Sequence, residues 1–269
     1  MTRLDMINAT ESVLVEREQL IPIAEAALLV ARLLMETGAS AKTVHEECSR
    51  VVRGLGAQHV DLRSGYDSLE ITIAKGASYI TRIVEIGPLG VNYRLAHAVR
   101  ALAKRIAEGE FTTAEAISEL TRVQKGTARH PRWVVAVGVG FACAAFGRLL
   151  GMDWAAFIPV LAGGTVGQWV RQILQRHGVN VFAVAGGIAF LASGLGALGS
   201  RFAGSTTVPL AMVASVLLLV PGVPALDAQY DILEGHPTLG IARAVVVSMT
   251  VIFMATGVLI AGVLLGVLK

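Results

Sequence analysis

The chain has 269 residues, of which 54% are hydrophobic and 16% charged, with a formal net charge of +3 and a mean hydropathy of +0.63. This hydrophobic content exceeds that of an ordinary soluble domain. The small, scattered positive charge, without basic runs that include aromatic residues, excludes a nucleic-acid-binding protein.

The charged residues are concentrated in the first half of the chain. Residues 1–132 hold 33 of the 43 Asp, Glu, Lys and Arg residues, and the remaining residues hold ten. This asymmetry predicts that one part of the chain is exposed to water and that the other is embedded in lipid.

The N-terminus lacks the apolar segment of a signal peptide, so we expect the first part to stay in the cytoplasm. Cys48 and Cys143 lie in different parts, which disfavours a disulfide and fits a reducing compartment.

The water-exposed part is predicted to be an α+β cytoplasmic domain over residues 19–128, after a flexible N-terminus at residues 1–18. Apolar residues recur at helical spacing from 19 to 36, and Ser40 is placed to cap a second helix. HVDL, SLEITIA and SYITRIVEI then predict short antiparallel strands. Asn92 and the capping-box pattern TTAE predict two more helices. The expected order is a helix pair, a small antiparallel sheet and a helix pair.

Residues 129–269 are predicted to form an all-α bundle of five transmembrane helices, since about 20 apolar residues cross a bilayer core. The expected spans are residues 133–151, 154–172, 180–200, 206–226 and 238–268. Lys and Arg residues predict a multi-pass protein with a cytoplasmic N-terminus and the C-terminus on the periplasmic side. Closely spaced glycines in these segments indicate tight packing between helices.

A Pro-Gly-x-Pro break ends the fourth apolar segment, at Pro221, Gly222 and Pro224. Inside lipid, the backbone groups that such a break frees need protein or a watery cavity to satisfy them. Transporters use interrupted helices to coordinate polar solutes or ions. The alternative is that the break simply ends a helix at the membrane surface, and the sequence leaves both interpretations open.

Three acidic residues follow the break, at Asp227, Asp231 and Glu234. If a helix resumes, their spacings of four and three place them near one face, where they would form an acidic mouth. Carboxylates partly withdrawn from water can carry protons. Arg243 is placed to pair with Asp231 across the following turn. The exporter hypothesis predicts that Asp231→Asn abolishes transport without changing the protein level.

The cytoplasmic part offers two weak catalytic patterns. One combines His45 with Cys48, and the other combines His59 with Ser64 and Asp67. Cys48 lies on the apolar stripe of its predicted helix, which favours a structural role. The histidines show no metal-binding spacing such as HExxH. We therefore predict no catalytic residue, no metal and no cofactor.

The run AMVASVLLLVPGVPALDAQYDILEGHPTLGIAR resembles the signature of the threonine/serine exporter family. In that signature a Pro-Gly-x-Pro break precedes a polar residue, an Asp, a Gly and Gly-x-x-Arg. Asp227 departs from the pattern, which usually has Asn there. The resemblance continues in METGASAKTVHEECSRVVRGLG, in TRIVEIGPLGVNYRLAHAVRAL and in HPRW, and covers residues 22–268. The matching positions are Pro221, Gly222, Pro224, Asp227, Asp231, Gly235, Gly240 and Arg243.

The resemblance implies a secondary exporter subunit that moves small hydrophilic metabolites across the bacterial inner membrane without ATP. The metabolites are threonine and serine, or a dicarboxylate such as succinate, and coupling to an ion gradient is expected. Full-length members carry a second hydrophobic part after this one. The chain is therefore similar to the split type, which works with a small hydrophobic membrane subunit; a homo-oligomer is a further possibility.

Two other classes remain open from the sequence. One is a membrane-anchored hydrolase, and the other is a sensor acting through the cytoplasmic domain. Anchoring needs only one or two helices, so the number of predicted spans favours the exporter.

Overall fold

The structure is a computed structural model that describes residues 3–76, 78–128 and 130–267, with side chains described from residue 17 onward except at position 218. The chain divides into two compact units. Unit 1 comprises Met1–Ala128 and Val223–Ala244, and unit 2 comprises Arg129–Gly222 and Val245–Lys269. A segment that follows most of the apolar chain therefore belongs to the same unit as the N-terminal half.

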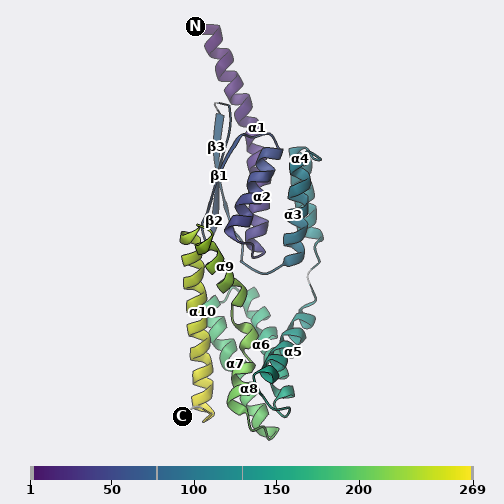
Figure 1. Cartoon of the computed structure of the whole chain (residues 1–269), viewed down its shortest axis with the longest axis vertical. Helices are drawn as coiled ribbons and strands as arrows, with labels where there is room; N and C mark the ends of the chain where they lie inside the picture. Colours follow the sequence, from purple (N-terminus) through teal and green to yellow (C-terminus); the bar gives the residue numbers. More distant parts are fainter. Residues whose placement is uncertain (1–2, 77, 129, 268–269) are drawn as a thin grey trace. The chain divides into compact units, whose positions relative to one another are not determined.

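Unit 1 contains the predicted order of a helix pair, a three-stranded sheet and a helix pair (Figure 1). Its first helix extends further toward the N-terminus than the apolar stripe indicated. Its elements are α1 (Arg3–Glu36), α2 (Ala41–Gly54), β1 (His59–Ser64), β2 (Ser68–Lys75), β3 (Ser78–Glu85), α3 (Tyr93–Ala107), α4 (Thr113–Gly126), α9 (Gly222–Leu233) and the first turns of α10 (Pro237–Leu264).

The helix starts in unit 1 are set by local side-chain caps, as the sequence predicted. Ser40 accepts a hydrogen bond from the Thr43 backbone N–H, and Asn92 caps α3 in the same way. Thr112 and Glu115 form a reciprocal capping box at the start of α4. Each cap satisfies backbone donors that the first turn of a helix leaves without partners.

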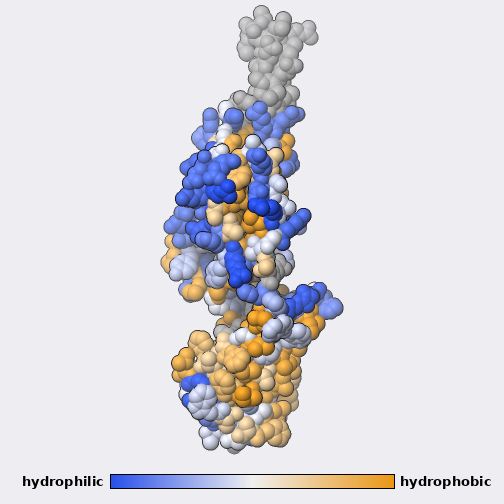
Figure 2. Space-filling model, turned by 90° about the vertical axis from the view of Figure 1, so that its right-hand side faces the viewer, coloured by the Kyte–Doolittle hydropathy of each residue, from blue (hydrophilic) through white to orange (hydrophobic). Residues whose placement is uncertain are grey.

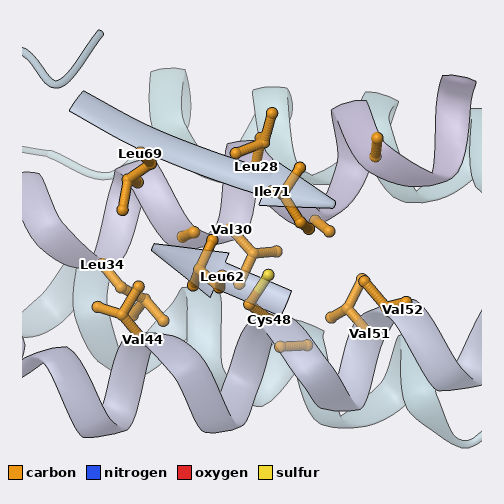
Figure 3. Packing of buried hydrophobic residues seen from close by; sticks show 14 of the residues in the cluster. Leu28, Val30, Leu34, Val44, Cys48, Val51, Val52, Leu62, Leu69 and Ile71 are labelled. Atoms are coloured by element: carbon orange, nitrogen blue, oxygen red, sulfur yellow. The ribbon is translucent and has the colours of Figure 1, made fainter. Parts of the chain in front are cut away.

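The sheet is antiparallel in the order β1-β2-β3 and packs against α1. In β2, Leu69, Ile71 and Ile73 alternate with less buried residues, as expected when one face of a strand contacts a core. Figure 3 shows this core, with side chains from α1, α2 and the strands pointing into it. Burial of these apolar side chains is the main stabilising term for unit 1.

Unit 2 is entirely helical over its described residues. Neighbouring helices pack against one another in sequence, α5 on α6, α6 on α7 and α7 on α8. Its visible surface is largely hydrophobic in Figure 2. Its elements are α5 (Arg132–Leu149), α6 (Phe157–Arg176), α7 (Val181–Phe202), α8 (Val208–Ala214), the short 3-10 helix η1 (Leu217–Leu219) and the part of α10 from Val245.

The prediction of five transmembrane helices is wrong. In the described part of the chain, three helices are long and apolar enough to cross a membrane: α5, α7 and α10. The expected span 154–172 became α6, whose last two turns carry glutamines and arginines that lower its hydropathy. The expected span 206–226 is divided among α8, η1 and α9, because the helix stops before the Pro-Gly-x-Pro break instead of running into it.

One polar cluster joins two loops of unit 2. Asp153, between α5 and α6, accepts hydrogen bonds from the Ser205 hydroxyl at 2.8 Å and from the Thr206 backbone N–H at 2.8 Å, both in the α7–α8 loop. Its other oxygen accepts from the Ala156 backbone N–H at 3.0 Å. Burial raises the pKa of Asp153, but the hydrogen bonds from Ser205, Ala156 and Thr206 outweigh it and lower the pKa to about 2.

We expect Asp153→Asn to lower the thermal stability of the protein at neutral pH. A depressed pKa means that the ionised carboxylate stabilises the fold above its ordinary pKa of 3.8, and that this contribution is lost as the pH falls toward about 2. The difference in melting temperature between variant and wild type should therefore be constant from pH 7 to about pH 5 and shrink below about pH 4. A difference that stays constant down to pH 3 would contradict the assigned role.

Candidate functional site

The predicted site residues after the helix break lie in unit 1, on a tight helical hairpin made by α9 and the start of α10. Gly235, with φ of +90°, ends α9 in the left-handed region that favours glycine. Pro237 then begins α10, where a proline costs no helical hydrogen bond. At Gly240 a Cβ would lie 2.8 Å from the Ala228 carbonyl oxygen, so only glycine permits this close approach.

The hairpin brings Asp231 and Arg243 into a buried ion pair, as the sequence predicted. Arg243 Nη1 lies 2.6 Å from Asp231 Oδ2, and the two side chains are 5% and 0% exposed. Asp231 Oδ1 accepts a hydrogen bond of 2.8 Å from the Ala41 backbone N–H, at the first residue of α2. Arg243 Nη2 lies 3.3 Å from the Met35 sulfur at the end of α1.

This arrangement compensates the cost of burying two charges. Each Asp231 oxygen has a donor, and one of these donors is the positive N-terminal end of α2, where a carboxylate is stabilised. The pair therefore ties the hairpin after the helix break to the junction between α1 and α2. Ala41 and Met35 were not predicted as partners, because no local pattern relates residues 190 and 208 positions apart.

Asp227 lies one helical turn before Asp231 and is partly buried. Its Oδ2 is 3.9 Å from the position that a Cβ on Gly38 would occupy, in the connection between α1 and α2. Burial raises the pKa of Asp227, nearby Arg243 lowers it and nearby Asp231 raises it, and the net effect is a raised pKa. Asp227 is thus protonated up to a higher pH than an ordinary aspartate.

The remaining predicted site residues lie at the edge of this cluster or before it. Glu234 is 3.6 Å from Lys42 in a partly exposed ion pair, with side chains 28% and 55% exposed. Pro221 and Gly222 stand where α9 begins, and Pro224 lies in its first turn. An open acidic mouth made by all three acids is not what the described residues form, because Asp231 is fully buried and paired.

The catalytic alternatives are rearranged by the fold. His45 Nε2 lies 2.9 Å from the Ser64 hydroxyl, so the fold brings Ser64 to His45, whereas the sequence patterns combined Ser64 with His59 and His45 with Cys48. The rings of His45 and His236 are 4.5 Å apart. Burial lowers the pKa of His45, His236 lowers it further, and Asp61 raises it, so His45 is neutral at neutral pH. Nothing in the sequence signalled that His236 would meet His45.

Cys48 is buried in the core of unit 1, where Figure 3 shows it pointing from α2 into the apolar cluster. Burial raises the pKa of its thiol to about 12, which keeps the sulfur protonated. A protonated, inaccessible thiol is a poor nucleophile and metal ligand. Among the described residues, no three His, Cys, Asp or Glu side chains lie close enough together to hold a metal ion.

Residues 25–265 match the model of a family described as "Putative threonine/serine exporter". The chain is also similar to two proteins that are both named "Probable succinate transporter subunit YjjP". The protein from Escherichia coli (strain K12) is 31% identical over 233 residues, covering 85% of this chain and 89% of the relative. The protein from Klebsiella aerogenes is 27% identical over 234 residues, covering 86% and 89%. No solved structure matches the chain.

Proposed function

The chain belongs to the threonine/serine exporter family, and from this membership we propose that it is one subunit of a secondary exporter in the bacterial inner membrane. Its solute is a small hydrophilic carboxylate, either threonine and serine or a dicarboxylate such as succinate. The names of the two relatives favour the dicarboxylate, and the word "subunit" in them favours a separate partner. The partner proposed is the small hydrophobic membrane protein that supplies the family's second half.

The distribution of charge supports an orientation for this subunit. Unit 1 carries most of the charged residues, whereas the sequence of unit 2 is dominated by apolar side chains. Basic residues tend to stay on the cytoplasmic side of a membrane, and they cluster before the first apolar helix. We therefore place the N-terminus in the cytoplasm and the C-terminus on the periplasmic side.

The observation that carries the proposal is the buried Asp231–Arg243 pair directly after a helix break. A buried ion pair is often no more stabilising than apolar residues of the same volume, so stability alone does not account for it. In transporters, interrupted helices and buried charges belong to the solute and ion pathway. In our proposal Asp231 and Arg243 hold the hairpin, Pro221, Gly222 and Pro224 shape the opening, and Asp227 and Glu234 assist.

Asp227 gives the proposed ion coupling a testable pH dependence. The family pattern usually has asparagine at this position, so we expect Asp227→Asn to fold and to export. Because the folded protein raises the pKa of Asp227, the carboxyl group favours folding below its ordinary pKa and this contribution is lost as the pH rises through the raised value. The variant should therefore be at least as stable as wild type at pH 7.

The measurement is efflux and thermal unfolding between pH 5 and pH 8 for wild type and Asp227→Asn. We expect wild-type efflux to change across this range and the change to be smaller in the variant, since an amide does not titrate. Glu234→Gln is the matched comparison: Glu234 assists on the same helix hairpin but is more exposed than Asp227, so this variant should change the pH profile less than Asp227→Asn does. Identical pH profiles for wild type and Asp227→Asn would remove Asp227 from the proposed coupling.

The function itself is tested by efflux from cells loaded in parallel with threonine, serine and succinate. The chain is expressed alone and together with its small membrane partner. Efflux of one solute only when both proteins are present is the expected result and identifies the substrate class. No efflux in any combination would overturn the proposal. The hydrolase or sensor alternative would then be favoured, and the His45–Ser64 contact would be the first place to study.

A further inference from the structure

Unit 2 contains a small cavity that one arginine of α6 lines. Arg171 and Gln175 of α6 line it together with Val184 and Ile188 of α7 and with Thr250 of α10. Its volume is about 30 Å³, which is enough for a small polar group or a water molecule. The walls are mostly apolar, so the guanidinium group is the main charge in this space.

Among the residues that the structure describes, Arg171 has no protein partner for its charge. Over residues 3–76, 78–128 and 130–267, the structure gives it neither an ion pair nor a hydrogen bond. Two other arginines of unit 2 do have partners: Arg148 stacks on Trp154 at 4.4 Å, and Arg201 donates to the Leu265 carbonyl oxygen at 2.7 Å. The lack of a partner is therefore not a general property of arginines in this unit.

The sequence of unit 2 contains no further acidic side chain that could pair with Arg171. Asp153 is its sole acidic residue, and hydrogen bonds already hold that side chain between two loops. Against this one acid stand seven basic residues: Arg129, Arg132, Arg148, Arg171, Arg176, Arg201 and Lys269. An anion would stabilise a partly buried arginine in such surroundings, because an uncompensated charge away from water is costly.

The geometry points to a carboxylate as that anion. A guanidinium group forms two parallel hydrogen bonds to a carboxylate, and the pair is shorter and stronger than neutral hydrogen bonds. Gln175 follows Arg171 by four residues, so its amide lies on the same helix face and adds a donor. Thr250 donates its own proton to the Val246 carbonyl oxygen at 2.8 Å, so the donors that this lining offers to a carboxylate are the Arg171 guanidinium group and the Gln175 amide.

A lipid phosphate is the competing anion, because long basic side chains often extend toward headgroups. Arg171 lines a cavity whose other walls come from α7, η1 and α10, so it faces neighbouring helices of unit 2. Arg176, one turn and a half later on α6, is exposed and does not line the cavity. The two arginines therefore form a matched pair, one directed into the unit and one at its surface.

We propose that Arg171, assisted by Gln175, binds a carboxylate group of the exported solute in this cavity. The inference rests on the proposed exporter function and adds a binding residue to it. A cavity of about 30 Å³ accommodates a group of the size of a carboxylate but not a whole solute. The rest of the solute enters only when α6, α7 and α10 separate, as alternating access requires.

The test compares Arg171→Gln, Arg171→Lys and Arg176→Gln in the assembled exporter. We expect Arg171→Gln to raise the KM for efflux about tenfold or more, as loss of a charge-assisted bidentate contact predicts. Arg171→Lys keeps the positive charge but loses the planar guanidinium group that donates two parallel hydrogen bonds. Its KM should therefore lie between those of Arg171→Gln and wild type. Arg176→Gln should resemble wild type.

A binding measurement separates this inference from transport. Succinate or threonine should raise the melting temperature of the purified wild-type complex, whereas succinamide, which has no carboxylate, should not. Arg171→Gln should lose this rise in melting temperature while keeping the elution profile of a folded protein. If Arg171→Gln does not fold, the rise is measured for Arg171→Lys, where it should be smaller than in wild type. The experiment is repeated in bilayers with and without anionic lipid.

The outcomes are distinct. Wild-type efflux with an unchanged KM and an unchanged thermal shift in Arg171→Gln would overturn the carboxylate site and leave the exporter function standing. If the only change in Arg171→Gln is that its melting temperature no longer depends on anionic lipid, Arg171 binds a lipid phosphate, and the carboxylate site is also overturned. Absence of wild-type efflux would count against the exporter function, and the thermal shift would then decide on Arg171 by itself.

Discussion

Asp231→Asn is expected to lower the free energy of unfolding by about 3–5 kcal/mol and to abolish export. The substitution leaves the Arg243 guanidinium group, which is 5% exposed, without a counter-charge. It also replaces the carboxylate that accepts from the Ala41 backbone N–H at the N-terminus of α2 by a neutral amide. From the sequence alone we expected unchanged protein levels; the complete burial of Asp231 now leads us to expect a lower level of folded protein.

The measurement is denaturant or thermal unfolding of the purified protein, together with efflux from loaded cells. Glu234→Gln is the control, because the Glu234–Lys42 pair is partly exposed and such pairs contribute about 0–1 kcal/mol. The double variant Asp231→Asn/Arg243→Gln removes both buried charges and should recover most of the stability, but not export. Normal export by the double variant would show that transport does not need the charges.

Gly257→Leu is expected to prevent normal packing of unit 2 and to cost more than about 3 kcal/mol. A Cβ on Gly257 of α10 would overlap the Gly186 carbonyl oxygen of α7 and lie 2.9 Å from the Phe190 backbone nitrogen. Backbone atoms of a helix cannot move aside as the end of a flexible side chain can. The two helices would have to separate, which would remove the close contact that small residues permit between apolar helices.

Size-exclusion profiles and thermal unfolding in detergent measure this effect. Gly187→Leu is the matched control, since a Cβ on Gly187 meets no atom within 4 Å. We expect Gly187→Leu to behave like wild type and Gly257→Leu to give little folded protein. Equal stability of the two variants would mean that α7 and α10 do not approach each other at Gly257.

Local signals were sufficient for the starts of α2, α3 and α4 and for the strands of unit 1. Ser40, Asn92 and the Thr112–Glu115 capping box mark helix starts because each cap is a hydrogen bond between residues at most three positions apart. The alternation of Leu69, Ile71 and Ile73 likewise marks a strand with one buried face. These features depend on neighbouring residues, so a pattern in the sequence contains them.

Hydropathy over a window did not predict the apolar part correctly. It measures how many apolar residues follow one another, but not whether they form one continuous helix. The segment around Pro221 therefore counted as a span, although the chain there forms α8, η1 and α9 in succession. The same measure overvalued α6, whose polar residues lie in its last turns.

The amino-acid sequence by itself determined the division into a charged part and an apolar part, and the mixed α and β elements of the first half. It also determined the family and the pairing of Asp231 with Arg243 across one short turn. Only the tertiary structure decided that this pair binds the N-terminus of α2, and that Arg171 lines a cavity without an ion-pair partner among the described residues. Contacts between distant residues are set by how whole elements pack, and no short pattern in the chain encodes them.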